Sequence, residues 1–195
     1  MMPHIEYLFP IPVYCYDDLL TYKENKILQD EILKLSSSVS VGGDWNCNTF
    51  NSMGTYDLMY DETFSDINNK ITEHVNIFAK TFESDWKYRI KNAWFNVAQK
   101  NQYQEYHNHS DCVFSAVYYV SLPSGSGEII FKSKEDDMVS LRNIVEFNKF
   151  NSTYMSLQPK ERTLLIFRSS LQHMVKMGTN KKPRISLALN FMGDD

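Results

Sequence analysis

The sequence predicts a mainly β chain in which two helices pack on the outside of a C-terminal β-barrel. From residue 87 onward, short segments rich in aromatic and β-branched residues alternate with turn residues. Residues 123–127, for example, consist of proline, serine and glycine only. Two earlier segments carry apolar residues at helical spacing instead. The chain has 195 residues and is 43% hydrophobic, which suits one domain with a sizeable core.

The N-terminal part of this prediction is an edge strand followed by a helix. Residues 5–16 are mostly apolar, and Pro10 and Pro12 confine an extended segment of this kind to the edge of a sheet. Asp17 and Asp18 are expected to start the first helix, because acidic residues favour the first helical turn. Apolar residues then recur near a 3.6-residue period until the serines at 36–38 end the helix.

Residues 40–60 are polar and rich in turn residues, and we expect them to form a long loop. Loops of that length within a compact domain are often functional. Because this one carries Trp45, Phe50 and Tyr56, our hypothesis is that it covers the mouth of a binding site and selects what enters.

The remaining part of the chain is expected to form a second helix and then the strands. An apolar stripe in steps of three and four predicts a second helix that packs by one face, at Phe64, Ile67, Ile71, Val75, Phe78 and Phe82. The predicted strands are residues 88–97, 113–122, 128–132, 154–157, 162–168, 174–177 and 184–191. We therefore expect one domain over 1–195, with an N-terminal strand and supporting helices in 1–86 and the barrel core in 87–195.

Charge and cysteine content narrow the functional classes. The formal net charge is −4, and the best basic group, Lys176 with Lys181 and Lys182, is too small for a nucleic-acid footprint. No apolar run is long enough to span a membrane, and the N-terminus lacks the pattern of a secretory signal. An odd number of cysteines without metal-binding spacing indicates reduced thiols in the cytoplasm: Cys15, Cys47 and Cys112.

The most informative stretch is His107-Asn108-His109-Ser110-Asp111, with a distal His173 later in the chain. Alternate residues of a strand share a face, so His107, His109 and Asp111 point the same way if the strand extends that far. A single histidine in a barrel strand is usually a hydrogen-bonded structural residue. Two histidines at i and i+2, an acid at i+4 and a distal third histidine predict a metal site instead.

The residues leave two ligand sets open. The first takes His109, Asp111 and His173, whose types match the two-histidine, one-carboxylate face that binds non-haem Fe(II). The second takes His107, His109 and His173, as a cupin-like barrel would. The first set leaves one positive charge on a divalent metal site and the second leaves two, so the second would bind an anionic co-substrate more strongly.

Arg184 lies 11 residues beyond His173 (184 − 173), after a turn, and Ser186 shares its strand face. Arginine suits bidentate binding of a carboxylate, and a buried arginine requires such a partner. Placed after the distal histidine, this pair predicts a binding site for an acidic co-substrate.

These motifs resemble those of the Fe(II)/2-oxoglutarate oxygenase superfamily, and in particular the prolyl-hydroxylase-like oxygenases of marine phages and bacteria. The resemblance runs over nearly the whole chain, and its most specific block is Pro183–Phe191. The other matching segments are residues 8–13, 93–96, 106–109, 114–120, 165–167 and 171–173.

The resemblance implies a double-stranded β-helix, a jelly-roll or cupin-like barrel, that holds Fe(II) inside. It implies that 2-oxoglutarate chelates the iron while its far carboxylate meets Arg184 and Ser186. Tyr119, or its neighbour Tyr118, looks like the tyrosine that reaches the same carboxylate, and Asn96 is assigned to cofactor binding with it.

The chain departs from the family at the metal ligands. Aligned on Phe114-Ser115, His107 takes the first ligand position, His109 takes the position of the usual acid, and Ser110 replaces a proline. The alignment therefore favours the three-histidine set, whereas residue types favour the set with Asp111.

The implied reaction is oxygen-dependent hydroxylation of a C–H bond, with decarboxylation of 2-oxoglutarate to succinate. The substrate would be a peptidyl residue or a small molecule, and a phage-encoded enzyme would work in the host cytoplasm. Two rival interpretations stay open: a cupin-type three-histidine metalloenzyme that uses no keto acid, and a non-catalytic binding module built on the barrel.

Overall fold

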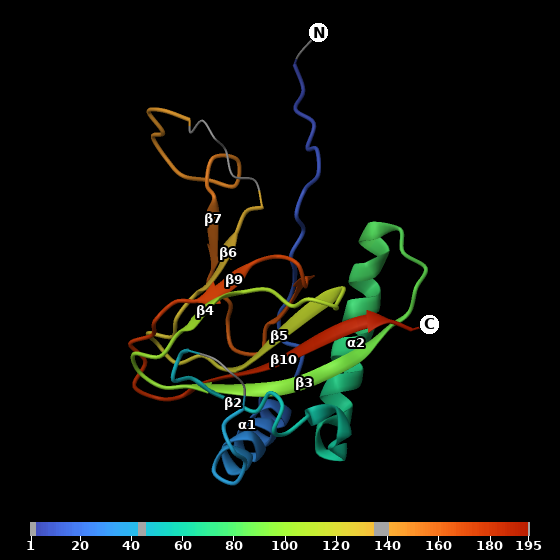
Figure 1. Ribbon diagram of the computed structural model, residues 1–195, viewed down its shortest axis with the longest axis vertical. Helices are drawn as coiled ribbons and strands as arrows, with labels where there is room; N and C mark the ends of the chain where they lie inside the picture. Colours follow the sequence, from blue (N-terminus) through green and yellow to red (C-terminus); the bar gives the residue numbers. More distant parts are fainter. Residues whose placement is uncertain (1–2, 43–45, 135–140, 195) are drawn as a thin grey trace.

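The computed structural model describes residues 3–42, 46–134 and 141–194, and within these ranges its strands form two antiparallel sheets (Figure 1). The larger sheet has the order β1 (Tyr14–Tyr16), β8 (Leu164–Arg168), β5 (Phe114–Ser121), β10 (Arg184–Gly193), β3 (Tyr88–Ala98), β2 (Phe50–Asn51). The smaller sheet has the order β4 (Gln104–His107), β9 (His173–Val175), β6 (Ile129–Lys132), β7 (Tyr154–Leu157). The prediction of a mainly β chain is confirmed.

Alternation along the central strands separates a helix-facing side of the larger sheet from an inner side. On β10, Ile185, Leu187, Leu189 and Phe191 join the main apolar core, which also contains the buried residues of both helices. The residues between them, from Arg184 to Asn190, line a cavity between the two sheets. Because side chains of a strand alternate between its faces, one strand can serve the core and the cavity together.

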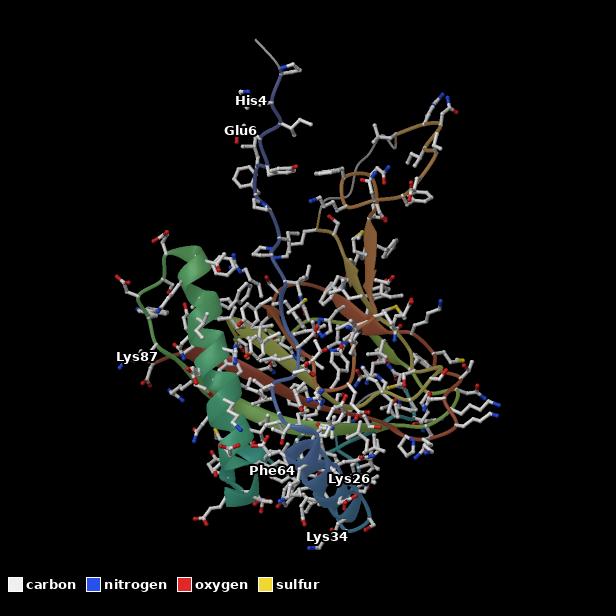
Figure 2. The ribbon with its side chains drawn as sticks, turned by 180° about the vertical axis from the view of Figure 1, so that it is seen from behind. His4, Glu6, Lys26, Lys34, Phe64 and Lys87 are labelled. Atoms are coloured by element: carbon white, nitrogen blue, oxygen red, sulfur yellow. The ribbon has the colours of Figure 1, made fainter. Side chains whose placement is uncertain are left out.

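The N-terminal segment forms a much shorter strand than expected. Only Tyr14–Tyr16 pair, with β8 at one edge of the larger sheet, so the edge position is confirmed and the length is wrong. Pro10 and Pro12 have no N–H to donate to a ladder. Figure 2 shows the preceding segment, which carries His4 and Glu6, extending away from the body of the molecule.

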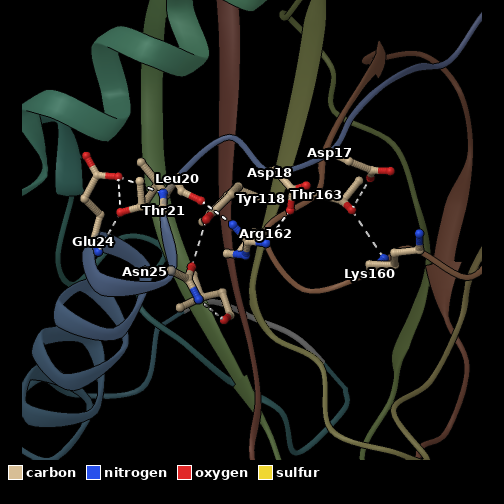
Figure 3. A network of polar contacts seen from close by, with 11 residues as sticks. Asp17, Asp18, Leu20, Thr21, Glu24, Asn25, Tyr118, Lys160, Arg162 and Thr163 are labelled. Atoms are coloured by element: carbon tan, nitrogen blue, oxygen red, sulfur yellow. Dashed lines mark hydrogen bonds and ion pairs between the residues drawn. The ribbon is translucent and has the colours of Figure 1, made fainter.

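The first helix, α1 (Tyr22–Ser36), starts later than predicted. Thr21 caps it, and the Thr21 and Glu24 side chains each accept from the backbone N–H of the other residue, which forms a capping box. Asp17 and Asp18 lie outside the helix and bind the turn before β8: Asp17 accepts from Thr163 Oγ1 at 2.6 Å and Asp18 pairs with Arg162 (Figure 3). The acids anchor the entry to the helix instead of starting it.

The second helix follows the predicted stripe. The helix α2 (Ser65–Ala79) lies between two short 3-10 turns, η2 (Glu62–Phe64) and η3 (Lys80–Phe82). Its buried residues, Ile67, Ile71, Val75 and Phe78, pack on the core of the larger sheet. Both helices cover the face of that sheet opposite the cavity (Figure 1). None of the helices in the described residues is long and apolar enough to cross a membrane.

The segment predicted as a long loop is more structured than expected. It contains β2 and the 3-10 turn η1 (Leu58–Tyr60). Phe50 stacks on Phe95 at 5.5 Å, and Tyr56 donates to Asp61 at 2.6 Å; both pack against the helix-side core. The hypothesis that these two aromatic residues cover a site is therefore wrong, and Trp45 lies outside the described residues.

Candidate metal centre

Three histidines converge between the sheets. His107 ends β4 and His173 begins β9, and the two residues are paired across the smaller sheet with ring centroids 4.2 Å apart. His109 follows two residues later, and its backbone N–H donates to the Ser169 carbonyl at 3.0 Å. One nitrogen from each ring lies within 4.8 Å of the other two, and no other group of this kind occurs in the described ranges.

The strand does not extend to Asp111, so the condition under which Asp111 would share a face with both histidines is not met. The strand ends at His107, so His109 reaches the cluster from a turn. Asp111 is exposed, has a left-handed backbone with φ 61°, and accepts from Lys91 Nζ through its carbonyl at 3.2 Å. It does not belong to the group of converging donor atoms, because the chain has turned away from the strand direction before it.

The environment keeps the imidazoles neutral. Burial lowers the pKa of His109 to about 4 and that of His173 to about 3, and it also lowers the pKa of His107. His107 Nδ1 lies 2.8 Å from the Glu105 carbonyl, and His173 Nδ1 lies 2.9 Å from the Leu171 carbonyl. Since a carbonyl can only accept, each Nδ1 carries the proton, and Nε2 presents the lone pair that a metal requires.

The cavity beside the histidines is lined by the inner faces of β3, β5 and β10. Trp94 and Asn96 come from β3, Tyr119 from β5, and Arg184 and Ser186 from β10. The sequence predicted roles for four of these side chains, and Trp94 was not among them. Its i, i+2 spacing from Asn96 was the signal that could have found it, because the two residues share a strand face.

Arg184 is a buried cation without a matching acid. It is 3% exposed, and no described carboxylate lies within ion-pair distance of it. Its Nη1 donates to Ser186 Oγ at 3.4 Å, and its guanidinium carbon lies 5.2 Å from the centre of the Tyr119 ring. Burial lowers the pKa of Arg184, and the neighbouring Tyr119 offsets this only in part.

One nitrogen of this guanidinium group and the neighbouring tyrosine hydroxyl have no well-aligned hydrogen bond to the described residues. Arg184 Nε and Tyr119 Oη are buried, and neither makes a well-aligned hydrogen bond, although Tyr119 Oη lies close enough to the guanidinium group to interact with its charge. Burial raises the pKa of Tyr119 to about 12. Tyr118 points the other way and donates to Asn25 Oδ1 at 2.8 Å (Figure 3). Asn96 Oδ1 accepts from Gln104 Nε2 at 3.1 Å. The donors around Arg184 therefore fit an anion with several oxygen atoms.

Comparison with known proteins identifies a family with this arrangement of residues. Residues 92–190, which hold the three histidines and Arg184, match the model of a family described as 2OG-Fe(II) oxygenase. No curated protein matches the chain.

Solved structures share the fold at low sequence identity. A Pseudomonas putida prolyl-4-hydroxylase is 13% identical, with a TM-score of 0.65, over 95% of this chain and 94% of its own. The viral collagen prolyl hydroxylase of Paramecium Bursaria Chlorella virus-1, solved with 2OG, is 16% identical with a TM-score of 0.57, over 92% and 94%. The epimerase SnoN from nogalamycin biosynthesis is 10% identical with a TM-score of 0.70, over 93% and 76%. These likenesses show a double-stranded β-helix.

Proposed function

The chain belongs to the 2OG-Fe(II) oxygenase family, which uses Fe(II) and 2-oxoglutarate, and on that premise we propose that it hydroxylates a C–H bond of a peptidyl residue or a small molecule. The observation that carries this proposal is the pairing of two features in one cavity. A cluster of neutral imidazoles lies on one wall, and a buried, uncompensated guanidinium group lies on the other.

The residues present fit an iron ion. In our proposal, His107, His109 and His173 are the ligands, each through a neutral imidazole, which is a donor that Fe(II) accepts. When bound, iron with 2-oxoglutarate supplies the activation of O2, the loss of CO2 and the formation of succinate. The protein supplies the rest: it holds the three rings in place and keeps them unprotonated.

The residues also fit the co-substrate. Arg184, Ser186 and Tyr119 would bind the far carboxylate of 2-oxoglutarate, since this anion satisfies the Arg184 charge and the Tyr119 hydroxyl together. Asn96 is proposed to support the same end from β3.

Apolar side chains pack behind the histidine cluster. The Phe167 ring packs edge-on against the His173 ring, with 4.8 Å between the ring centroids. The centroid of the Phe131 ring lies 6.1 Å from that of the same histidine. Both belong to the small apolar cluster between the sheets. This apolar wall would shield the reacting centre and strengthen every charge interaction in it.

The proposed substrate class rests on likeness of fold. Two of the solved structures named above are prolyl hydroxylases, which favours a peptidyl substrate, and the epimerase shows that the same fold also serves other reactions.

A cytoplasmic location is part of the proposal, because Cys15, Cys47 and Cys112 are free thiols.

Succinate formation tests the proposal. The purified protein with Fe(II), O2 and 2-oxoglutarate should release succinate slowly without substrate and faster with a peptide or metabolite that it accepts. His173→Ala should abolish both rates. A cupin-type enzyme or a non-catalytic module would bind metal or a partner without converting the keto acid, so a complete absence of succinate in the metal-loaded protein would refute the function.

A further inference from the structure

Trp94 carries an unexplained polar atom into the same cavity. The residue lies on β3, opposite Ala188 of β10, and is 3% exposed. Its ring lies 5.7 Å from that of His109, centre to centre. The indole Nε1 is buried and has no hydrogen-bond partner among the described residues.

An indole N–H can only donate, so it needs an acceptor. Buried donors without a partner are rare in folded proteins, and each one calls for an explanation such as a ligand that is bound during function. The cavity wall near Trp94 offers the imidazoles, whose Nε2 atoms face a metal in the proposed function, and no described side chain accepts from the indole. A bound molecule with an acceptor atom at this position would therefore complete the hydrogen bonding of the cavity wall.

The strand register shows which end of that molecule Trp94 faces. Ser186 on β10 lies opposite Tyr119 on β5 and Asn96 on β3, and this layer surrounds the Arg184 guanidinium group. Ala188, two residues further along β10, lies opposite Trp94. Two residues of a strand advance about 7 Å, so Trp94 occupies the next layer, beside His109.

The two layers are separated by the length of a short dicarboxylic acid. One layer offers the donors of Arg184, Ser186 and Tyr119, and the other offers the Trp94 N–H beside the histidines. A five-carbon keto diacid that binds the first layer with one carboxylate brings its other carboxylate to the second layer. Resting on the proposed function, we infer that the Trp94 indole N–H donates to the metal-binding carboxylate of 2-oxoglutarate.

Removal of the N–H alone tests this inference. Trp94→Phe keeps an aromatic ring and removes the donor, and Trp86→Phe is the matched control because Trp86 is 61% exposed and packs beside Gly193. With the Fe(II)-loaded protein under anaerobic conditions, calorimetry should show binding of 2-oxoglutarate weakened about tenfold in Trp94→Phe and unchanged in Trp86→Phe. The affinity for Fe(II) should be the same in all three proteins.

Oxalate identifies the end of the ligand that Trp94 contacts, because it has the metal-chelating end alone. Trp94→Phe should weaken oxalate and 2-oxoglutarate alike, whereas Arg184→Met should weaken 2-oxoglutarate and spare oxalate. Wild-type affinity of Trp94→Phe for both anions would overturn the inference, and so would a loss confined to 2-oxoglutarate. A wild-type protein that binds Fe(II) but neither anion would refute the proposed function as well.

A measurement on the wild-type protein covers the case in which Trp94→Phe does not fold. With Zn(II) in place of iron, the indole 15N–1H resonance of Trp94 should move downfield and exchange more slowly with solvent when 2-oxoglutarate is added. The exposed Trp86 resonance serves as the internal reference and should not move. A Trp94 resonance unchanged by saturating 2-oxoglutarate would overturn the inference.

Discussion

Replacement of Arg184 by methionine should have opposite effects on stability and on ligand binding. Among the described residues, the 3.4 Å contact to Ser186 and the neighbouring Tyr119 offset the loss of hydration of the buried guanidinium group. An apolar side chain of similar length removes that desolvation penalty. We therefore expect the free energy of unfolding of the ligand-free variant to be about 1–2 kcal/mol higher than that of the wild type. This value is at the low end of the stabilisation that apolar replacement of buried charges gives.

Binding of 2-oxoglutarate should weaken in the same variant. The guanidinium group can make two charge-assisted hydrogen bonds to one carboxylate, each worth about 1.5–3 kcal/mol. A loss of about 3 kcal/mol corresponds to a dissociation constant raised by more than about 100-fold.

Thermal unfolding of the Zn(II)-loaded proteins measures both effects. At a 2-oxoglutarate concentration of about 100 times the wild-type dissociation constant, the wild type gains about 2.7 kcal/mol. That gain corresponds to about 5–10 °C for a chain of this size. Arg184→Met at the same concentration should gain only about 1–2 °C, and its ligand-free midpoint should lie above that of the wild type.

Arg162 provides the matched control, because it is also buried but pairs with a carboxylate. Its Nη1 donates to the Leu20 carbonyl at 2.8 Å, its Nη2 pairs with Asp18, and it lies over the Tyr22 ring (Figure 3). Arg162→Met should lower stability by about 2 kcal/mol and leave 2-oxoglutarate binding unchanged. If Arg184→Met instead destabilises the ligand-free protein as Arg162→Met does, or retains wild-type affinity, Arg184 is a structural residue and our reasoning is refuted.

Further predictions concern the metal ligands and pH. His173→Ala and His107→Ala should each abolish the thermal stabilisation by Zn(II) and the metal content measured after dialysis, whereas Asp111→Ala should leave both unchanged; the reverse result for Asp111 and His107 would restore the ligand set with the carboxylate. His109→Asp should retain metal and bind 2-oxoglutarate less tightly, because the site then carries one positive charge fewer; calorimetry that shows equal or tighter binding would contradict this. The metal-free protein should lose stability as pH falls from about 6.5 toward 4, because the unfolded histidines take up protons there while His109 and His173, with pKa values of about 4 and 3, do not. Urea midpoints that stay constant over this range would exclude buried neutral imidazoles.

The sequence was sufficient for features that depend on local pattern. The apolar stripe at Ile67, Ile71, Val75 and Phe78 predicted α2, since a helical period leaves one face to bury. The alternation in Arg184-Ile185-Ser186 predicted which residues of β10 share a face, since a strand has a period of two. The predicted start of the first helix was wrong because tertiary partners compete for the acidic residues. Asp17 and Asp18 bind Thr163 and Arg162 instead of starting α1.

The sequence by itself determined the strand-rich second half, both helices and the histidines and arginine that resemble an oxygenase site. Only the tertiary structure decided which groups meet. It excluded Asp111 from the histidine cluster, because β4 ends at His107 and the following turn leaves that carboxylate exposed. It also brought Trp94 and Tyr119 into the cavity with unpaired polar atoms. Whether a polar atom has a partner depends on side chains far away in the chain, and no local pattern records that.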